Sequence, residues 1–102
     1  MGGPKENPAA TGRRLSARFE GQVQGVGFRI TTAQLAQGFP VSGYVLNTME
    51  GDVRLVVEGA EPAVLAFWDA LKSSPVYRFV RREYLAWSPA TGEFTGFGIR
   101  YA

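Results

Sequence analysis

A glycine-rich segment, residues 21–29, lies where the hydrophobic pattern of this 102-residue chain changes its period. Before it, apolar and polar residues alternate over residues 15–20, which is typical of a strand with one buried face. After it, apolar residues recur at helical spacing over residues 28–39, and Pro40 then blocks continuation. The segment therefore joins a strand directly to a helix, which must pack back on the sheet that the strand enters.

The same two patterns divide the rest of the chain. Alternation, turn residues and a proline at a first helical position predict a strand, a strand, a helix, a strand and a short strand. In chain order, these elements cover residues 41–48, 52–58, 61–72, 76–87 and 97–101. The order predicts an α+β fold, a ferredoxin-like βαββαβ sandwich with a mostly antiparallel sheet, two helices on one face and a short extra C-terminal strand.

Residues 1–13 contain Gly, Pro, Asn and Ala without an apolar period, so we expect a disordered N-terminal tail before one domain over residues 14–102. No apolar run approaches the roughly 20 residues of a membrane span, and the N-terminal stretch lacks the apolar centre of a signal peptide. We therefore expect a cytoplasmic protein that has no membrane partner and is a monomer.

The chain contains neither His nor Cys. A His-dependent triad, a Cys nucleophile and a thiolate zinc site are therefore excluded, and the sequence offers no metal site. Catalysis by this chain must depend on positioning and electrostatics, or on carboxylates.

The formal net charge is +2. Lys5, Arg13 and Arg14 against Glu6 account for that charge near the N-terminus, so the rest of the chain is neutral. A charge count therefore gives no support to a basic face for nucleic acid, and we expect no nucleic-acid partner.

Residues 21–29 also carry the groups of an anion site. Glycines let backbone N–H groups approach a ligand, a helix N-terminus leaves donors free, and Arg29 adds a planar cation suited to phosphate. No Lys-Ser or Lys-Thr pair follows the glycines, and Ile30 stands where a dinucleotide-binding loop needs its third glycine. The residues alone leave two interpretations open: a phosphate site, or a tight turn that lets helix and strand pack closely.

Asn47, near the end of the second predicted strand, is the other candidate residue. Asn is common before a turn, and its amide is no base at neutral pH. The amide could instead hold a water molecule or a substrate oxygen by hydrogen bonds.

Two segments resemble the signature motifs of the acylphosphatase family. The first motif resembles residues 19–29, which read FEGQVQGVGFR. The second resembles residues 43–53, which read GYVLNTMEGDV and are followed by Gly59. The resemblance covers roughly residues 15–101 and includes the predicted order of elements.

The resemblance implies that the chain hydrolyses acyl phosphates to a carboxylate and inorganic phosphate, without a cofactor. It also implies two catalytic residues: Arg29 would bind the phosphoryl oxygens and Asn47 would orient the attacking water. The phosphate would be held as well by loop N–H groups, those of Gln24, Gly25, Val26, Gly27 and Phe28. A cation and a ring of N–H donors suit the charge that phosphoryl transfer spreads over the equatorial oxygens.

Two non-catalytic functions remain as alternatives. RNA-recognition modules share this element order, but they stack bases on aromatic residues of the third strand, and residues 52–58 contain none. The other alternative is a domain that binds phosphate or carbamoyl phosphate without efficient turnover.

Overall fold

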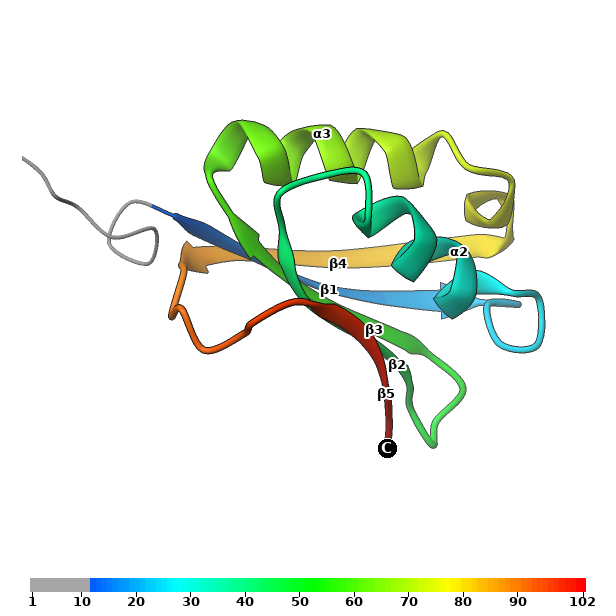
Figure 1. Cartoon of the computed structure of the whole chain (residues 1–102). Helices are drawn as coiled ribbons and strands as arrows, with labels where there is room; N and C mark the ends of the chain where they lie inside the picture. Colours follow the sequence, from blue (N-terminus) through cyan, green and yellow to red (C-terminus); the bar gives the residue numbers. More distant parts are fainter. Residues whose placement is uncertain (1–11) are drawn as a thin grey trace, which may run out of the picture.

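The computed structural model of the chain describes residues 12–102. Its helices and strands are, in chain order, β1 (Arg13–Gly21), α2 (Phe28–Ala36), β2 (Ser42–Asn47), β3 (Val53–Gly59), α3 (Glu61–Lys72), the 3-10 helix η1 (Pro75–Phe79), β4 (Val80–Pro89) and β5 (Phe97–Tyr101) (Figure 1). Residues 1–11, which hold most of the expected tail, lie outside the described residues. Arg13, which the sequence assigned to the tail, is instead the first residue of β1, because it pairs with both Gly59 and Pro89.

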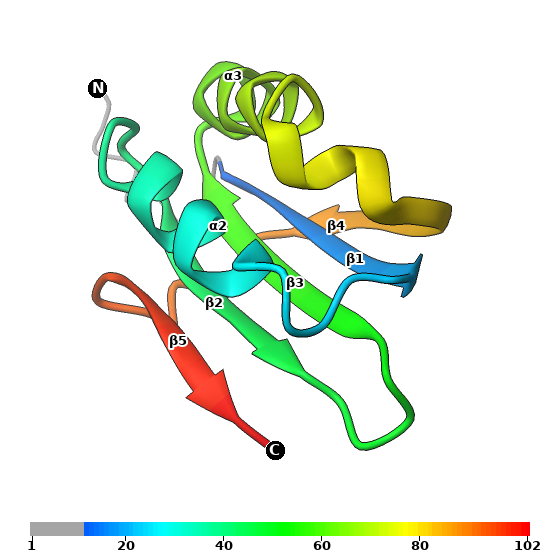
Figure 2. The same ribbon diagram turned by 90° about the vertical axis from the view of Figure 1, so that its right-hand side faces the viewer.

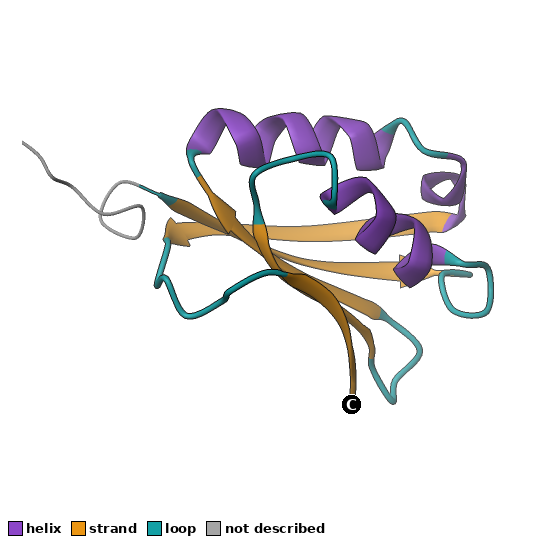
Figure 3. Cartoon of the chain, in the orientation of Figure 1, coloured by secondary structure: helices purple, strands orange, loops and turns teal. Residues whose placement is uncertain are grey.

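The five strands form one sheet in the order β4-β1-β3-β2-β5. Strand β1 pairs antiparallel with β3 and β4, and β2 pairs antiparallel with β3. The added strand β5 runs parallel to β2 at the other edge. Both helices cover the same face of the sheet and leave the opposite face open (Figures 2 and 3). The predicted ferredoxin-like sandwich is confirmed, and no helix within residues 12–102 is long and apolar enough to cross a membrane.

Two element boundaries differ from the prediction. Residues 76–79 were expected to begin a strand, but they form η1 with Pro75 in its first turn, and β4 starts only at Val80. Proline favours the start of a helical turn, and this turn buries Val76 in the hydrophobic core. The first helix ends at Ala36 with Gln37 as its C-cap, one residue before the C-cap expected at Gly38.

An aromatic cluster fixes both ends of the glycine-rich segment. The ring of Phe19, near the end of β1, lies 5.4 Å from that of Phe28 at the start of α2. It also lies 5.9 Å from Trp68 in α3 and 5.7 Å from Tyr77 in η1. Phe19 and Phe28 are almost completely buried. Because aromatic pairs add to the free energy of apolar burial, this cluster sets where the segment leaves the sheet and where it enters the helix.

A buried carboxylate holds the connection between β4 and β5. Glu58, only 3% exposed, accepts hydrogen bonds from Arg14 Nε at 2.7 Å, from the N–H of Thr91 at 3.0 Å and from the N–H of Gly92 at 3.0 Å. Burial alone raises the pKa of Glu58, but these donors together hold that pKa below its ordinary value of 4.5. The ionised carboxylate is therefore a structural link between the sheet and the loop that leads into β5.

We expect Glu58→Gln to lower the free energy of unfolding by about 2–4 kcal/mol near neutral pH, because the buried donors lose their charged acceptor. The folded-state pKa is depressed, so this contribution is complete above pH 4.5 and is lost as the pH falls through the folded value. Urea unfolding across the acidic range should show the gap between wild type and variant closing. A gap that is independent of pH would contradict this role.

The matched control is Glu61→Gln. Glu61 pairs with Arg13 at 3.7 Å, and its side chain is 54% exposed. An exposed pair of this kind contributes about 0.5 kcal/mol or less, so the control should unfold almost as the wild type does.

Candidate active site

Two glycines shape the loop between β1 and α2. Gly25 has φ 79° and Gly27 has φ 83°, which is left-handed backbone that favours glycine. A Cβ at either position would meet nothing within 4 Å, so conformation and not space is what requires glycine there. Left-handed residues in such a loop turn successive N–H groups toward a common point.

Four successive N–H groups of this loop, at residues 24–27, lack a backbone acceptor within the part of the chain that the structure describes. No backbone carbonyl among residues 12–102 accepts a hydrogen bond from Gln24, Gly25, Val26 or Gly27. Gly27 is the N-cap of α2, and no side chain caps this helix. Free N–H groups at a helix N-terminus attract anions, because the helix dipole adds a partial positive charge there.

Beside this loop lies a small cavity of about 110 Å³. Its lining comes from the loop, the first turn of α2 and the end of β2: Val23, Gly25, Gly27, Phe28, Arg29, Ile30 and Asn47. The structure thus brings Arg29 and Asn47 together with three of the five predicted loop residues. The volume is a few times the roughly 30 Å³ that a water occupies in the liquid, which is the scale of an oxyanion.

Asn47, which lines this cavity, carries an unpartnered polar atom. Its Oδ1 is buried and has no hydrogen-bond partner, the one side-chain atom of this kind among residues 12–102. A buried carbonyl oxygen without a donor costs free energy, so such atoms are rare in folded proteins. The position is suited to accept a hydrogen bond from a bound water molecule or ligand.

The two predicted loop residues outside the cavity have other contacts. Val26 is half-buried and packs against the core. The Gln24 side chain donates from Nε2 to the carbonyls of Thr48 and Asp52, both at 2.8 Å. It therefore ties the glycine loop to the turn that follows Asn47. Sequence reasoning assigned Gln24 only a backbone N–H and missed this tether.

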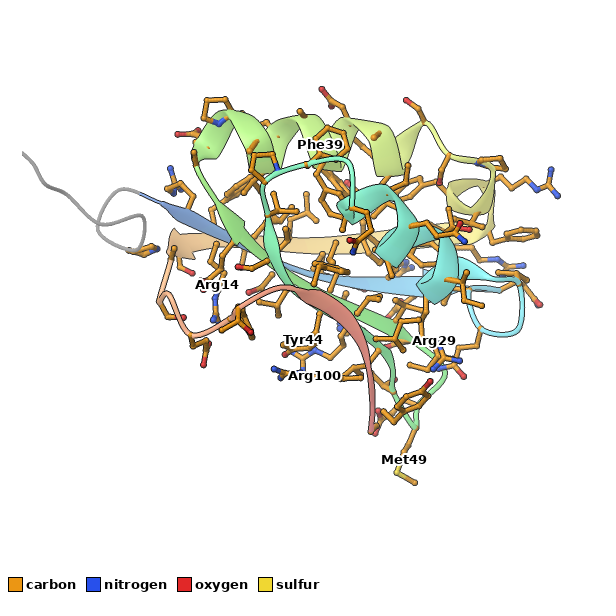
Figure 4. The ribbon with its side chains drawn as sticks, viewed as in Figure 1. Arg14, Arg29, Phe39, Tyr44, Met49 and Arg100 are labelled. Carbon is orange, nitrogen blue, oxygen red and sulfur yellow. The ribbon has the colours of Figure 1, made fainter. Side chains whose placement is uncertain are left out.

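Tyr101 contacts the candidate site residue Arg29, a contact that the sequence did not indicate. The Arg29 guanidinium lies 5.4 Å from the centroid of its ring, and Arg29 makes no ion pair within residues 12–102. Parallel pairing of β5 with β2 places Tyr101 opposite Asn47. Tyr101 is 79% exposed and Met49 is 91% exposed. Figure 4 shows Arg29 and Met49 at the same end of the molecule.

An arginine, a set of free N–H groups and an unpartnered amide oxygen lie together on a ferredoxin-like sandwich, which makes this an α+β protein with a candidate oxyanion site. The sequence model of the acylphosphatase family matches residues 15–99. The chain therefore belongs to the acylphosphatase family. Membership makes it a hydrolase that acts on small acyl phosphates.

Individual relatives agree with the family match. An acylphosphatase of Salinibacter ruber is 40% identical over 90 residues, which cover 88% of this chain and 95% of the relative. An acylphosphatase of Arthrobacter sp. is 40% identical over 101 residues, or 99% of this chain and 93% of the relative. The crystal structure of acylphosphatase from Bacillus subtilis is similar with a TM-score of 0.77 at 32% identity, and covers 87% of this chain and 99% of that one.

Proposed function

We propose that Arg29 and Asn47 are the catalytic residues of acyl phosphate hydrolysis in this chain. Arg29 and the N–H groups from Gln24 to Phe28 hold the phosphoryl oxygens. Asn47 Oδ1 accepts a hydrogen bond from the attacking water. The observation that carries this proposal is the unpartnered side-chain oxygen of Asn47, a residue that lines the same cavity as Arg29 and the glycine loop.

The reaction balances without a further acid or base. Water attacks phosphorus in line and forms the new P–O bond, while the bond between phosphorus and the acyl oxygen breaks. The electron pair leaves with the carboxylate, which is a stable anion and needs no proton. The proton of the water passes to a phosphoryl oxygen, so the products are a carboxylate and inorganic phosphate. Positioning and charge stabilisation then supply the acceleration.

A pair of substrates tests this assignment. The purified chain should hydrolyse benzoyl phosphate rapidly and 4-nitrophenyl phosphate poorly, because an alkyl or aryl oxide leaves less readily than a carboxylate. In water labelled with heavy oxygen, the label should enter phosphate and not benzoate. Label in benzoate would show attack at carbon, and phosphate binding without turnover would support the non-catalytic alternative.

We expect Gln24→Ala to lower kcat/KM for benzoyl phosphate about tenfold, because two hydrogen bonds that join the loop to the turn after Asn47 are lost. Steady-state kinetics measures the effect. Gln22→Ala is the matched control, since Gln22 is an exposed residue of the same type two positions earlier. Equal rates for the two variants would contradict a positioning role for the Gln24 side chain.

A further inference from the structure

The open face of the sheet gathers arginines that a charge count of the whole chain conceals. Strand register places Tyr84, Arg18, Arg54, Leu46 and Arg100 in one row across all five strands. Arg18 is paired with Glu20 and Asp52. Within residues 12–102, Arg54 and Arg100 make no ion pair. Arg54 on β3 and Arg100 on β5 are therefore the arginines of this row that no carboxylate within residues 12–102 pairs with.

Arg100 is stacked on aromatic rings. Its guanidinium lies 4.3 Å from the ring centroid of Tyr44 and 5.4 Å from that of Phe94. The two rings are 5.7 Å apart in an edge-to-face arrangement. Figure 4 shows Tyr44 and Arg100 together on the side of the sheet away from the helices. Stacking holds the guanidinium in place. The N–H donors of Arg100 lie in the plane of its guanidinium, where they are available to an anion.

A second cavity, of about 360 Å³, lies beside this stack along β5 and the loop before it. It shares no lining residue with the cavity of Arg29 and Asn47. Its volume falls in the range of sites for small organic ligands, whereas the catalytic cavity holds little more than a phosphate. Glu93, on the cavity wall, shares Arg14 with Glu58, so one cation there faces two carboxylates. Arg100 is the arginine on the wall, and no carboxylate within residues 12–102 pairs with it.

Two glycines in the wall of this second cavity leave space that a side chain would fill. Gly96 and Gly98 line this cavity, and a Cβ built on either would meet no heavy atom within 4 Å. Neither residue has a left-handed φ, so the backbone does not require glycine there. At these two positions the absence of a side chain keeps the volume open beside Tyr44 and Arg100.

We propose that this cavity binds a nucleoside monophosphate, with the phosphate on the Arg100 guanidinium and the base against the aromatic surface of Tyr44. A fixed guanidinium grips a phosphate with two parallel hydrogen bonds, and an aromatic face beside it stacks a planar base. The ligand is a free mononucleotide or the terminal nucleotide of a single strand. The proposal is independent of the catalytic roles given to Arg29 and Asn47.

Calorimetric titration of the whole chain with AMP tests the site. Saturable binding is expected, and Gly98→Leu should abolish it by filling the cavity. Arg100→Gln should weaken binding about tenfold, the effect of losing one charge-assisted contact. Arg54→Gln, an unpaired arginine of the same face outside the cavity, should change affinity less than about twofold. Adenosine and ribose 5-phosphate should each bind more weakly than AMP.

Further measurements separate this site from the catalytic one. AMP should bind Arg29→Ala as it binds the wild type, and Gly98→Leu should keep its unfolding temperature and its hydrolysis of benzoyl phosphate. If a pentanucleotide binds more tightly than AMP, and if Gly98→Leu and Arg100→Gln both weaken that binding, the ligand is the end of a strand. If the pentanucleotide and AMP bind with equal affinity, the ligand is the free nucleotide. No saturable binding, AMP binding unchanged in both Gly98→Leu and Arg100→Gln, or binding lost in Arg29→Ala would overturn the proposal.

Discussion

Arg29→Ala is expected to reduce kcat/KM for benzoyl phosphate about a thousandfold, within the range found when an arginine that stabilises phosphoryl-transfer charge is removed. The Arg29 guanidinium is the cation that lines the cavity of the glycine loop, and no carboxylate within residues 12–102 pairs with it. Arg29→Lys should also lose about a hundredfold, because an ammonium is a point charge that cannot form two parallel hydrogen bonds.

Measuring the free energy of unfolding of the Arg29→Ala variant separates a loss of catalysis from a loss of folded protein. Arg29 makes one stacking contact, with Tyr101, so its loss should change the free energy of unfolding by about 1 kcal/mol or less. Arg78→Ala is the matched control, because the Arg78 guanidinium is also stacked on a ring, that of Phe79 at 4.9 Å, outside the cavity. Arg78→Ala should retain full activity. Equal activities of Arg29→Ala and the wild type would remove Arg29 from the mechanism.

Asn47→Ala is expected to lower kcat about a hundredfold or more while KM changes little, because water orientation acts on the transition state and not on phosphate binding. The same variant should be as stable as the wild type or more stable by up to about 1 kcal/mol, since it removes a buried oxygen that has no partner. Kinetics and urea unfolding on one preparation measure both effects.

A variant of the next residue, Thr48→Ala, should lose stability and keep activity. The Thr48 hydroxyl accepts a hydrogen bond from the N–H of Asp52 at 3.1 Å and lies outside the cavity lining. Thr48→Ala should cost about 1 kcal/mol of stability and keep most of the activity. If Asn47→Ala instead lost stability and kept kcat, Asn47 would be a structural residue of the turn and the proposed mechanism would fail.

Most of the order of helices and strands could be predicted from the sequence. The spacing of apolar residues indicates a strand or a helix, and this spacing depends only on residues that are close together in the chain. Alternation in β1, β2 and β3 and the helical period of α2 and α3 appear directly in the sequence. The error at residues 76–79 has a local cause. Aromatic and β-branched residues there are typical of a strand, but Pro75 and the burial of Val76 favour a 3-10 turn.

The glycine loop and Arg29 were indicated by the sequence as a candidate anion site, and Asn47 was indicated by the resemblance to the family motif. The glycines, the start of a helix and an arginine lie together within residues 21–29, so one short segment contains all these anion-binding groups. The motif around Asn47 is a second short segment. The structure adds that Arg29 and Asn47 line one cavity. It also adds that the Gln24 side chain reaches the turn after Asn47, a contact between residues that are 24 positions apart.

The sequence by itself determined most of the local elements of this protein, with residues 76–79 as the exception. It also determined where the glycine loop lies and which residues have the chemistry to hold a phosphate. Only the tertiary structure decided which distant side chains share a surface. Parallel pairing of β5 with β2 brings Tyr101 beside Asn47 and Arg100 beside Tyr44. The physical reason is that periodicity is set by adjacent residues, whereas strand neighbours are chosen by the packing of the whole sheet.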